Sequence, residues 1–100
     1  MNDQSLPVVL SQKARKDFVD ILRYTAEQWG KAQLEIYRRK IDTAIQRISR
    51  NPEIGALRHD LDQPYRTFPV GVHLIVYRRQ ENQIRLIRIL HQRMDPAHSY

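Results

Sequence analysis

Residues 84–95 read IRLIRILHQRMD, and this stretch decides the fold. Its first seven residues are β-branched or aliphatic apart from Arg85 and Arg88, a composition typical of a β-strand. One alternating face carries Ile84, Leu86 and Leu90, and the other carries Ile87 and Ile89. A strand that is apolar on both faces usually lies inside a sheet covered on each side. Because this chain has only 100 residues, we expect it to cover one face and to leave the other for a partner.

Two amphipathic helices are predicted upstream of this strand. The first begins at Ser11, a favourable N-cap residue, and ends at Gly30. The second follows at once and stops at Asn51, because the residue before a proline avoids helical geometry. Apolar residues recur in both at steps of three and four, so the pair is expected to form a helical hairpin. We expect the aromatic side chains of Tyr24 and Trp29 to pack inside it.

The remaining apolar runs predict short strands. Residues 6–10 form the first, residues 65–70 a strand interrupted by Pro69, and residues 72–79 the next. Residues 51–64 are predicted to be a loop, with Leu57 and Leu61 anchored in the core. The expected fold is α+β with the order β-α-α-β-β-β, a helical hairpin packed on one face of a small antiparallel sheet. Residues 1–100 then form a single domain.

Composition and charge restrict the function. The net charge is +6, and residues 63–100 carry six arginines against Glu81 and Asp95. A basic surface of this kind favours an acidic partner, either nucleic acid or protein. The sequence has no cysteine, no apolar run long enough to span a bilayer, and no secretory signal. We therefore expect a cytoplasmic protein without a bound metal or cofactor.

Three polar positions stand out against this apolar background. Arg88 lies in the middle of an apolar strand, where an unpaired charge is costly. Its carboxylate partner is either internal, such as Asp17 or Asp20, or belongs to another protein, and the sequence leaves both possibilities open. His73 alternates with apolar residues and is expected to be packed and hydrogen-bonded. Residues 91–95 follow the last strand and place several polar groups at one rim, which makes them a candidate surface for a target.

Several phrases of the sequence, taken together, resemble the ParE-type toxins of the RelE/ParE superfamily. They occur in order over almost the whole chain and comprise residues 10–14, 21–30, 51–55, 66–71, 76–78 and 87–95. The resemblance implies the toxin of a two-gene toxin–antitoxin pair. It implies a cognate, ParD-like antitoxin whose acidic, amphipathic C-terminal segment forms a hetero-oligomer with the toxin. It also implies that the target is DNA gyrase.

These expectations assign two sets of residues. The proposed target-facing residues are His91, Gln92, Arg93, Met94 and Asp95. The proposed antitoxin-binding residues are Trp29, Tyr77, Arg78, Ile87, Arg88 and Ile89. No membrane contact is expected. No direct, sequence-specific DNA binding is expected either, because the chain lacks a recognition-helix motif with a basic exposed end.

The RelE branch of the superfamily offers an alternative function, ribosome-dependent cleavage of messenger RNA. Such chemistry needs a proton-transfer group beside a cluster of cations. Arg66 and Arg88 could stabilise charge, and His91 or Tyr100 could transfer a proton. The sequence departs from that branch because residues 63–100 contain no lysine and residues 91–95 are of the ParE kind. A non-enzymatic toxin is therefore the preferred interpretation.

Overall fold

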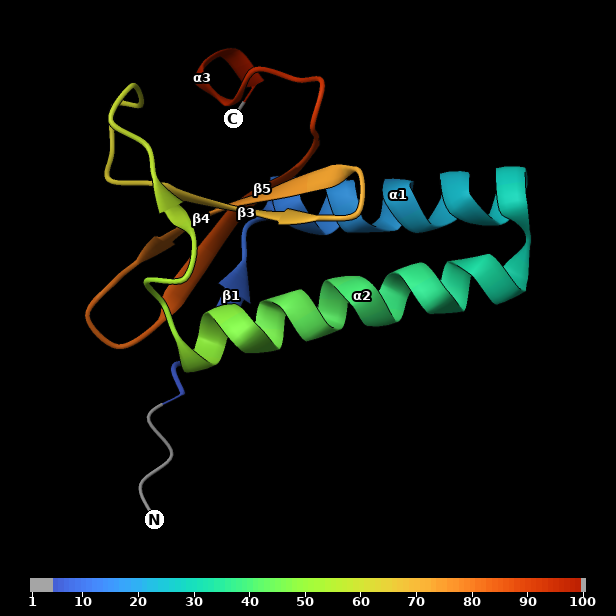
Figure 1. The fold of residues 1–100 in the computed structure, drawn as a ribbon, viewed down its shortest axis with the longest axis horizontal. Coiled ribbons are helices and arrows are strands. Elements are labelled where there is room, and N and C mark those ends of the chain that lie inside the picture. Colours follow the sequence, from blue (N-terminus) through green and yellow to red (C-terminus); the bar gives the residue numbers. More distant parts are fainter. Residues whose placement is uncertain (1–4, 100) are drawn as a thin grey trace.

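The structure is a computed structural model that describes residues 5–99. Helices α1 (Gln12–Trp29) and α2 (Lys31–Arg50) form the expected hairpin, which extends beyond the sheet (Figure 1). Ser11 caps α1, since its Oγ accepts a hydrogen bond of 3.0 Å from the backbone N–H of Ala14. Gly30 joins the helices at φ 88°, a conformation that glycine tolerates best. The predicted start of α1 at Ser11, the break at Gly30 and the end of α2 at Asn51 are all confirmed.

The sheet has five strands in the order β1-β5-β4-β3-β2. The strands are β1 (Val8–Leu10), β2 (Ala56–Leu57), β3 (Arg66–Val70), β4 (His73–Arg79) and β5 (Ile84–His91). The pairing of β1 with β5 is parallel and the other pairs are antiparallel, so the sheet is mixed and not wholly antiparallel as expected. Neither β2 nor the short helix α3 (Pro96–Ser99) was predicted. The two residues of β2 are both exposed and too few to show an alternating pattern.

The main core lies between the helical hairpin and one face of the sheet. It is built from Ala14, Ile21, Ile41, Ala44, Ile48, Val70, Ile75, Tyr77, Ile84, Leu86 and Ile89. The fully buried Tyr77 also ties the loop after α2 to the sheet. Its hydroxyl accepts from the N–H of Gly55 at 2.9 Å and donates to the carbonyl of Pro52 at 2.8 Å. A Cβ at residue 55 would lie 2.7 Å from that hydroxyl, so this contact requires glycine.

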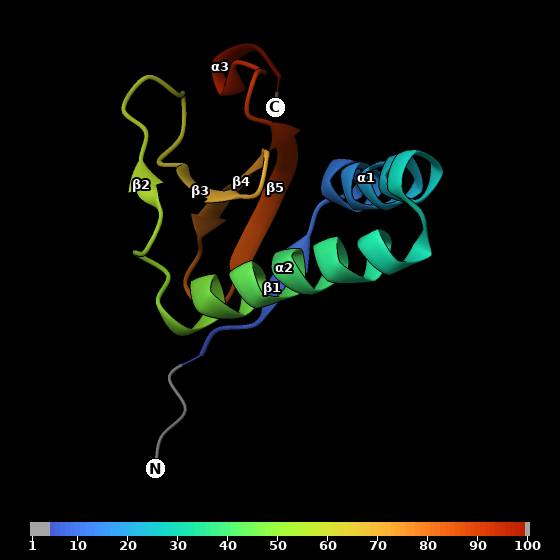
Figure 2. The same cartoon turned by 45° about the vertical axis from the view of Figure 1, so that its right-hand side comes forward.

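The opposite face of the sheet is covered by the chain itself. Val76 and Leu90 are buried there beneath Tyr65, with Leu61 packed against them. Figure 2 shows α3 and the segment between β2 and β3 on the side of the sheet away from α2. The expectation that this face stays open for a partner is wrong, because the segment after β2 folds back over it. Leu61 does anchor that segment, whereas Leu57 is 41% exposed and does not.

A β-bulge changes which residues of β5 face the helices. Val76 pairs with Arg88 and Tyr77 pairs with Leu86, so Ile87 is an extra residue in β5. The extra residue shifts the alternation by one position. Ile89 therefore lies in the same core as Leu86, contrary to the expectation that the two occupy opposite faces.

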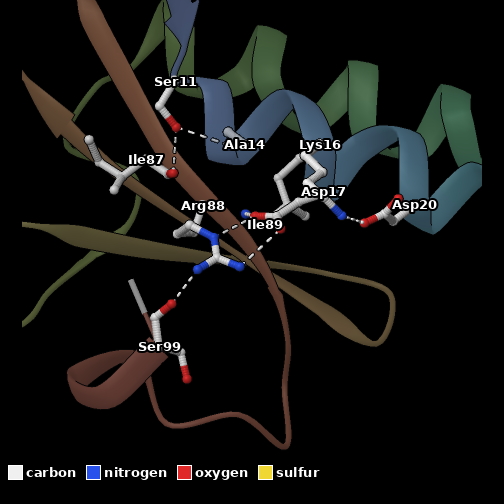
Figure 3. Close-up of polar contacts among 9 residues, drawn as sticks. All are labelled: Ser11, Ala14, Lys16, Asp17, Asp20, Ile87, Arg88, Ile89 and Ser99. Atoms are coloured by element: carbon white, nitrogen blue, oxygen red, sulfur yellow. Dashed lines mark hydrogen bonds and ion pairs between the residues drawn. The ribbon is translucent and has the colours of Figure 1, made fainter.

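Beyond Leu86, where its pairing with β1 ends, β5 has a free edge, and the start of α1 covers it (Figure 3). Ser11 Oγ donates to the carbonyl of Ile87 at 2.7 Å, and Asp17 Oδ2 accepts from the N–H of Ile89 at 2.9 Å. The same carboxylate pairs with Arg88 through contacts of 2.7 and 3.0 Å. Arg88 also donates to the carbonyl of Ser99 in α3. Of the two partners left open for Arg88, the structure contains the internal one, Asp17.

Replacing Asp17 by alanine should destabilise the fold strongly, because it leaves Arg88 and the N–H of Ile89 without their acceptor. Breaking a largely buried pair typically costs about 3–5 kcal/mol. Urea unfolding followed by circular dichroism measures the loss. Asp20→Ala is the matched control, because its carboxylate is exposed and pairs only with cations of the same helix, Lys16 at 2.8 Å and Arg23 at 4.0 Å. Equal losses in the two variants would contradict this role for Asp17.

Candidate functional site

Exposed apolar side chains gather where the helical hairpin passes the end of the sheet. We call Tyr24, Trp29 and Val72 the aromatic rim; they are 62%, 72% and 55% exposed. Packing of Tyr24 and Trp29 inside the hairpin was therefore a wrong expectation. The last turns of α1 project past the sheet, where no further layer covers them (Figure 1). Large exposed apolar side chains that cluster in this way mark candidate contact surfaces.

The rim encloses a hollow of about 440 Å³. It is lined by Tyr24, Thr25, Trp29, Gln33, Tyr37, Val72 and His73. The Tyr37 hydroxyl lies 2.5 Å from His73 Nδ1, 3.1 Å from the carbonyl of Val70 and 3.2 Å from the N–H of Val72, which donates to it. Gly71 has φ 56° and passes so close to Tyr37 that a Cβ would meet its ring at 2.6 Å. The floor of the hollow is therefore fixed in place by several contacts.

His73 connects this hollow to the end of β5. Its ring packs edge-to-face against Tyr37 and against His91, with centroid distances of 5.5 Å in both cases. Burial lowers the pKa of His73, and the nearby His91 lowers it further, whereas Asp17 acts in the opposite direction. The expectation of a packed, hydrogen-bonded histidine is confirmed.

The turn that carries the five proposed target-facing residues contacts the aromatic rim at Val72, whose carbonyl accepts from the N–H of Gln92 at 2.9 Å. Gln92 donates from its side chain to the carbonyl of Gly71 at 2.9 Å, which holds the turn against the rim. Arg93 and Met94 are exposed, and Asp95 Oδ1 accepts from the N–H of Ala97 at the start of α3. The turn after β5 thus adjoins the aromatic rim at Val72, through contacts of His91 and Gln92 with residues 71–73.

The proposed antitoxin-binding residues do not form a single surface. Trp29 belongs to the aromatic rim, and half-buried Arg78 donates to Gln63 at 2.8 Å near the other end of β4. Ile87 packs on the face of the sheet away from the helices. Arg88 is engaged by Asp17 of α1. The other two residues lie in the core and are closed to a partner in this conformation: Tyr77 and Ile89.

The three described residues of the nuclease alternative, Arg66, Arg88 and His91, do not form one cluster. Arg66 donates to the carbonyls of Gly55 and Glu53, at 2.8 and 3.3 Å. Arg66 pairs with residue 77 of β4 whereas His91 pairs with residue 73, so about 13 Å of strand separates their positions. Arg88 is engaged by Asp17, and Tyr100 lies outside the described residues. Within residues 5–99, no cluster of three or more metal-ligating side chains is present.

Comparison with known proteins identifies the family. Residues 8–96 match the family described as the ParE toxin of the type II toxin–antitoxin system parDE. The chain belongs to the ParE toxin family. Toxin ParE1 of Mycobacterium tuberculosis is 38% identical over 88 residues, covering 87% of this chain and 90% of that protein. Toxin ParE1 of Caulobacter vibrioides is 34% identical over 89 residues, covering 89% and 92%.

A solved structure shares the fold of this ParE-family chain. It belongs to the chromosomal ParDE toxin–antitoxin system of P. aeruginosa, with a TM-score of 0.73 and 18% identity. The alignment covers 88% of this chain and 97% of that one. No helix within residues 5–99 is both long and apolar enough to cross a membrane.

A second apolar hollow in this ParE-family chain lies between β1 and α1. We call it the edge groove; it has a volume of about 540 Å³ and is lined by Val8, Val9, Leu10, Arg15, Phe18, Val19 and Leu22. Because β1 is an outermost strand, its far side has no neighbouring strand. This groove was not among the features predicted from the sequence. The available signal was Val19, an apolar residue outside the core-facing stripe of α1 and 53% exposed.

The histidine contacts predict a pH dependence of stability. A His73 pKa below its unfolded value means that the fold favours the neutral ring. The stabilisation is complete above the unfolded pKa, near 6.5, and is lost as the pH falls through the folded pKa. The melting temperature should therefore fall between pH 7.5 and about pH 5, and less so in His73→Gln. His59→Gln, at an exposed position, should keep the dependence of the unmodified protein. An unchanged pH profile in His73→Gln would contradict the assignment.

Proposed function

We propose that this chain inhibits DNA gyrase in the cytoplasm and that a cognate antitoxin blocks it by binding. The match of residues 8–96 to the ParE toxin family carries the proposal. The inhibition is proposed to work through binding and not through catalysis. In support, Arg66, Arg88 and His91 are separated or already engaged, so they do not form the cation and proton-transfer cluster that RNA cleavage needs.

The target-facing surface is proposed to be the aromatic rim together with residues 91–95. Aromatic residues, methionine and arginine are enriched at protein interfaces, and this surface exposes all three kinds. Its backbone is held by several contacts, including those of Gln92 and Tyr37. A surface ordered before binding loses less conformational entropy when the target docks.

The antitoxin is proposed to occupy the edge groove with its acidic, amphipathic segment. The groove offers apolar side chains such as Phe18 and Val19, and the exposed Arg15 at its rim can pair with a carboxylate. Lys13 and Lys16 add positive charge to the same turns of α1, although Lys16 already pairs with Asp20. These features fit a partner that brings both apolar side chains and negative charge.

Alanine at both Arg93 and Met94 should weaken inhibition of gyrase at least about tenfold, since interface anchors commonly contribute 1.4 kcal/mol or more. The measurement is supercoiling of relaxed plasmid by purified gyrase over a range of toxin concentrations. A parallel translation reaction monitors the message, which should remain intact. Arg79→Ala on β4 is the control, an exposed cation away from this surface. Cleaved message with normal supercoiling would favour the nuclease function instead.

Glutamate at Val19 should abolish antitoxin binding and leave gyrase inhibition unchanged, because it places a charge in the edge groove. Co-expression with the neighbouring open reading frame, followed by co-purification, measures the binding. Leu57→Glu is the matched control, since Leu57 is similarly exposed but lies on β2 at the opposite edge of the sheet. Retained antitoxin binding in the Val19→Glu variant would exclude the groove as the site.

A further inference from the structure

One face of α2 carries a row of exposed cations. We call this set the α2 basic face; it consists of Arg39, Lys40, Arg47 and Arg50, all of which are exposed. Successive helical residues are about 100° apart, so these four fall within an arc of about 100° that also contains Thr43. The core-facing residues Ile41, Ala44 and Ile48 occupy a different arc of the helix.

The cations of this face are not paired with acids in the part of the chain that the structure describes. Among residues 5–99, no ion pair joins any of its four cations to an acidic side chain. The acids of α2 are Glu35 and Asp42, which lie on the adjoining flank and are held by Arg38 at 2.6 and 3.0 Å. Hydrogen bonding from Arg38 is the main cause that lowers the pKa of Glu35, and the charge of Arg39 contributes less. The basic face therefore presents positive charge to an external partner.

The face also borders a hollow. A space of about 290 Å³ lies between α2 and β3, with Arg39, Lys40 and Arg47 on the helix side and Phe68, Pro69 and Val70 on the strand side. The guanidinium of Arg47 lies 5.3 Å from the centroid of the Phe68 ring. This stacking holds the Arg47 guanidinium beside the hollow before a ligand binds. The side chain therefore loses little further conformational freedom on binding.

We propose that the α2 basic face binds the phosphate backbone of a nucleic acid without reading its sequence. Residues 39–50 span about 17 Å of helix, long enough to meet several successive phosphates. Three of the four cations are arginines, whose planar guanidinium groups match phosphate oxygens in pairs. An acidic, amphipathic protein segment is the less favoured ligand, because the two larger apolar hollows, of about 540 and 440 Å³, lie elsewhere, and the arc itself is mostly polar.

The binding is measured by fluorescence anisotropy with labelled 20-nucleotide probes: duplex DNA, single-stranded DNA and single-stranded RNA. The unmodified chain should bind at least one of them, with an affinity that falls steeply between 50 and about 200 mM salt. A variant with Arg39→Gln, Lys40→Gln and Arg47→Gln should bind about tenfold or more weakly, with a salt slope smaller by about 2–3. The probe that binds with the highest affinity identifies the class of nucleic acid that the face prefers.

The control variant removes the same charge from elsewhere: Lys13→Gln, Arg23→Gln and Arg79→Gln, three exposed cations on α1 and β4. It should change the affinity by less than about threefold, as expected for a loss of distant, screened charge. Equal weakening of both variants would overturn the proposal, since the attraction would then be diffuse. It would also be overturned if a glutamate-rich peptide bound the face while none of the nucleic acids did. Neither measurement contains gyrase or antitoxin, so the outcome is independent of the proposed function.

Discussion

The free edge of β5 is the constraint on which this fold depends. A parallel partner, β1, pairs with β5 only as far as Leu86, and the backbone beyond that point would otherwise be exposed at a sheet edge. The first turns of α1 replace the missing strand, because Ser11 donates to the carbonyl of Ile87 and Asp17 accepts from the N–H of Ile89. A helix therefore completes the hydrogen bonding of a strand, and the orientation of the hairpin relative to the sheet follows from this contact.

Arg88 links the same contact to the C-terminal turn. Its strand partner is Val76, which lies on the face away from the helices, yet its guanidinium reaches around the free edge to Asp17. It also holds the carbonyl of Ser99, so α3 is tied to the same point (Figure 3). One ion pair thus fixes three segments that are distant in sequence: the start of α1, the bulge of β5 and the C-terminal turn. The pair contributes more to specifying this arrangement than to net stability, since the desolvation of two charges offsets much of their attraction.

The sequence predicted the parts of the fold that depend on periodicity. Both helices, their caps at Ser11 and Gly30, and the three central strands follow from spacing and from residue types with one conformational role. The direction of β1 could not be predicted, because parallel and antiparallel pairing need the same apolar pattern. The bulge at Ile87 could not be predicted either. One unpaired residue changes which side chains of β5 share a face of the sheet, without changing the composition of the strand. The error about the open sheet face arose from the segment before Tyr65, which reads as a polar loop yet covers Val76 and Leu90.

The candidate site was predictable only in part, for a related reason. Residues 91–95 could be placed at a rim because they follow the last strand, but their contacts with residues 71–73, at the turn between β3 and β4, could not be predicted. Trp29 and Tyr24 obey the helical period, which normally indicates burial, and are exposed because α1 is longer than the sheet it covers. A protein of this size satisfies its core with the inner faces of a few elements. The part of the hairpin that extends beyond the sheet adds nothing to that core, so its apolar side chains stay exposed. Exposed apolar surface of this kind is unfavourable in water unless a partner covers it.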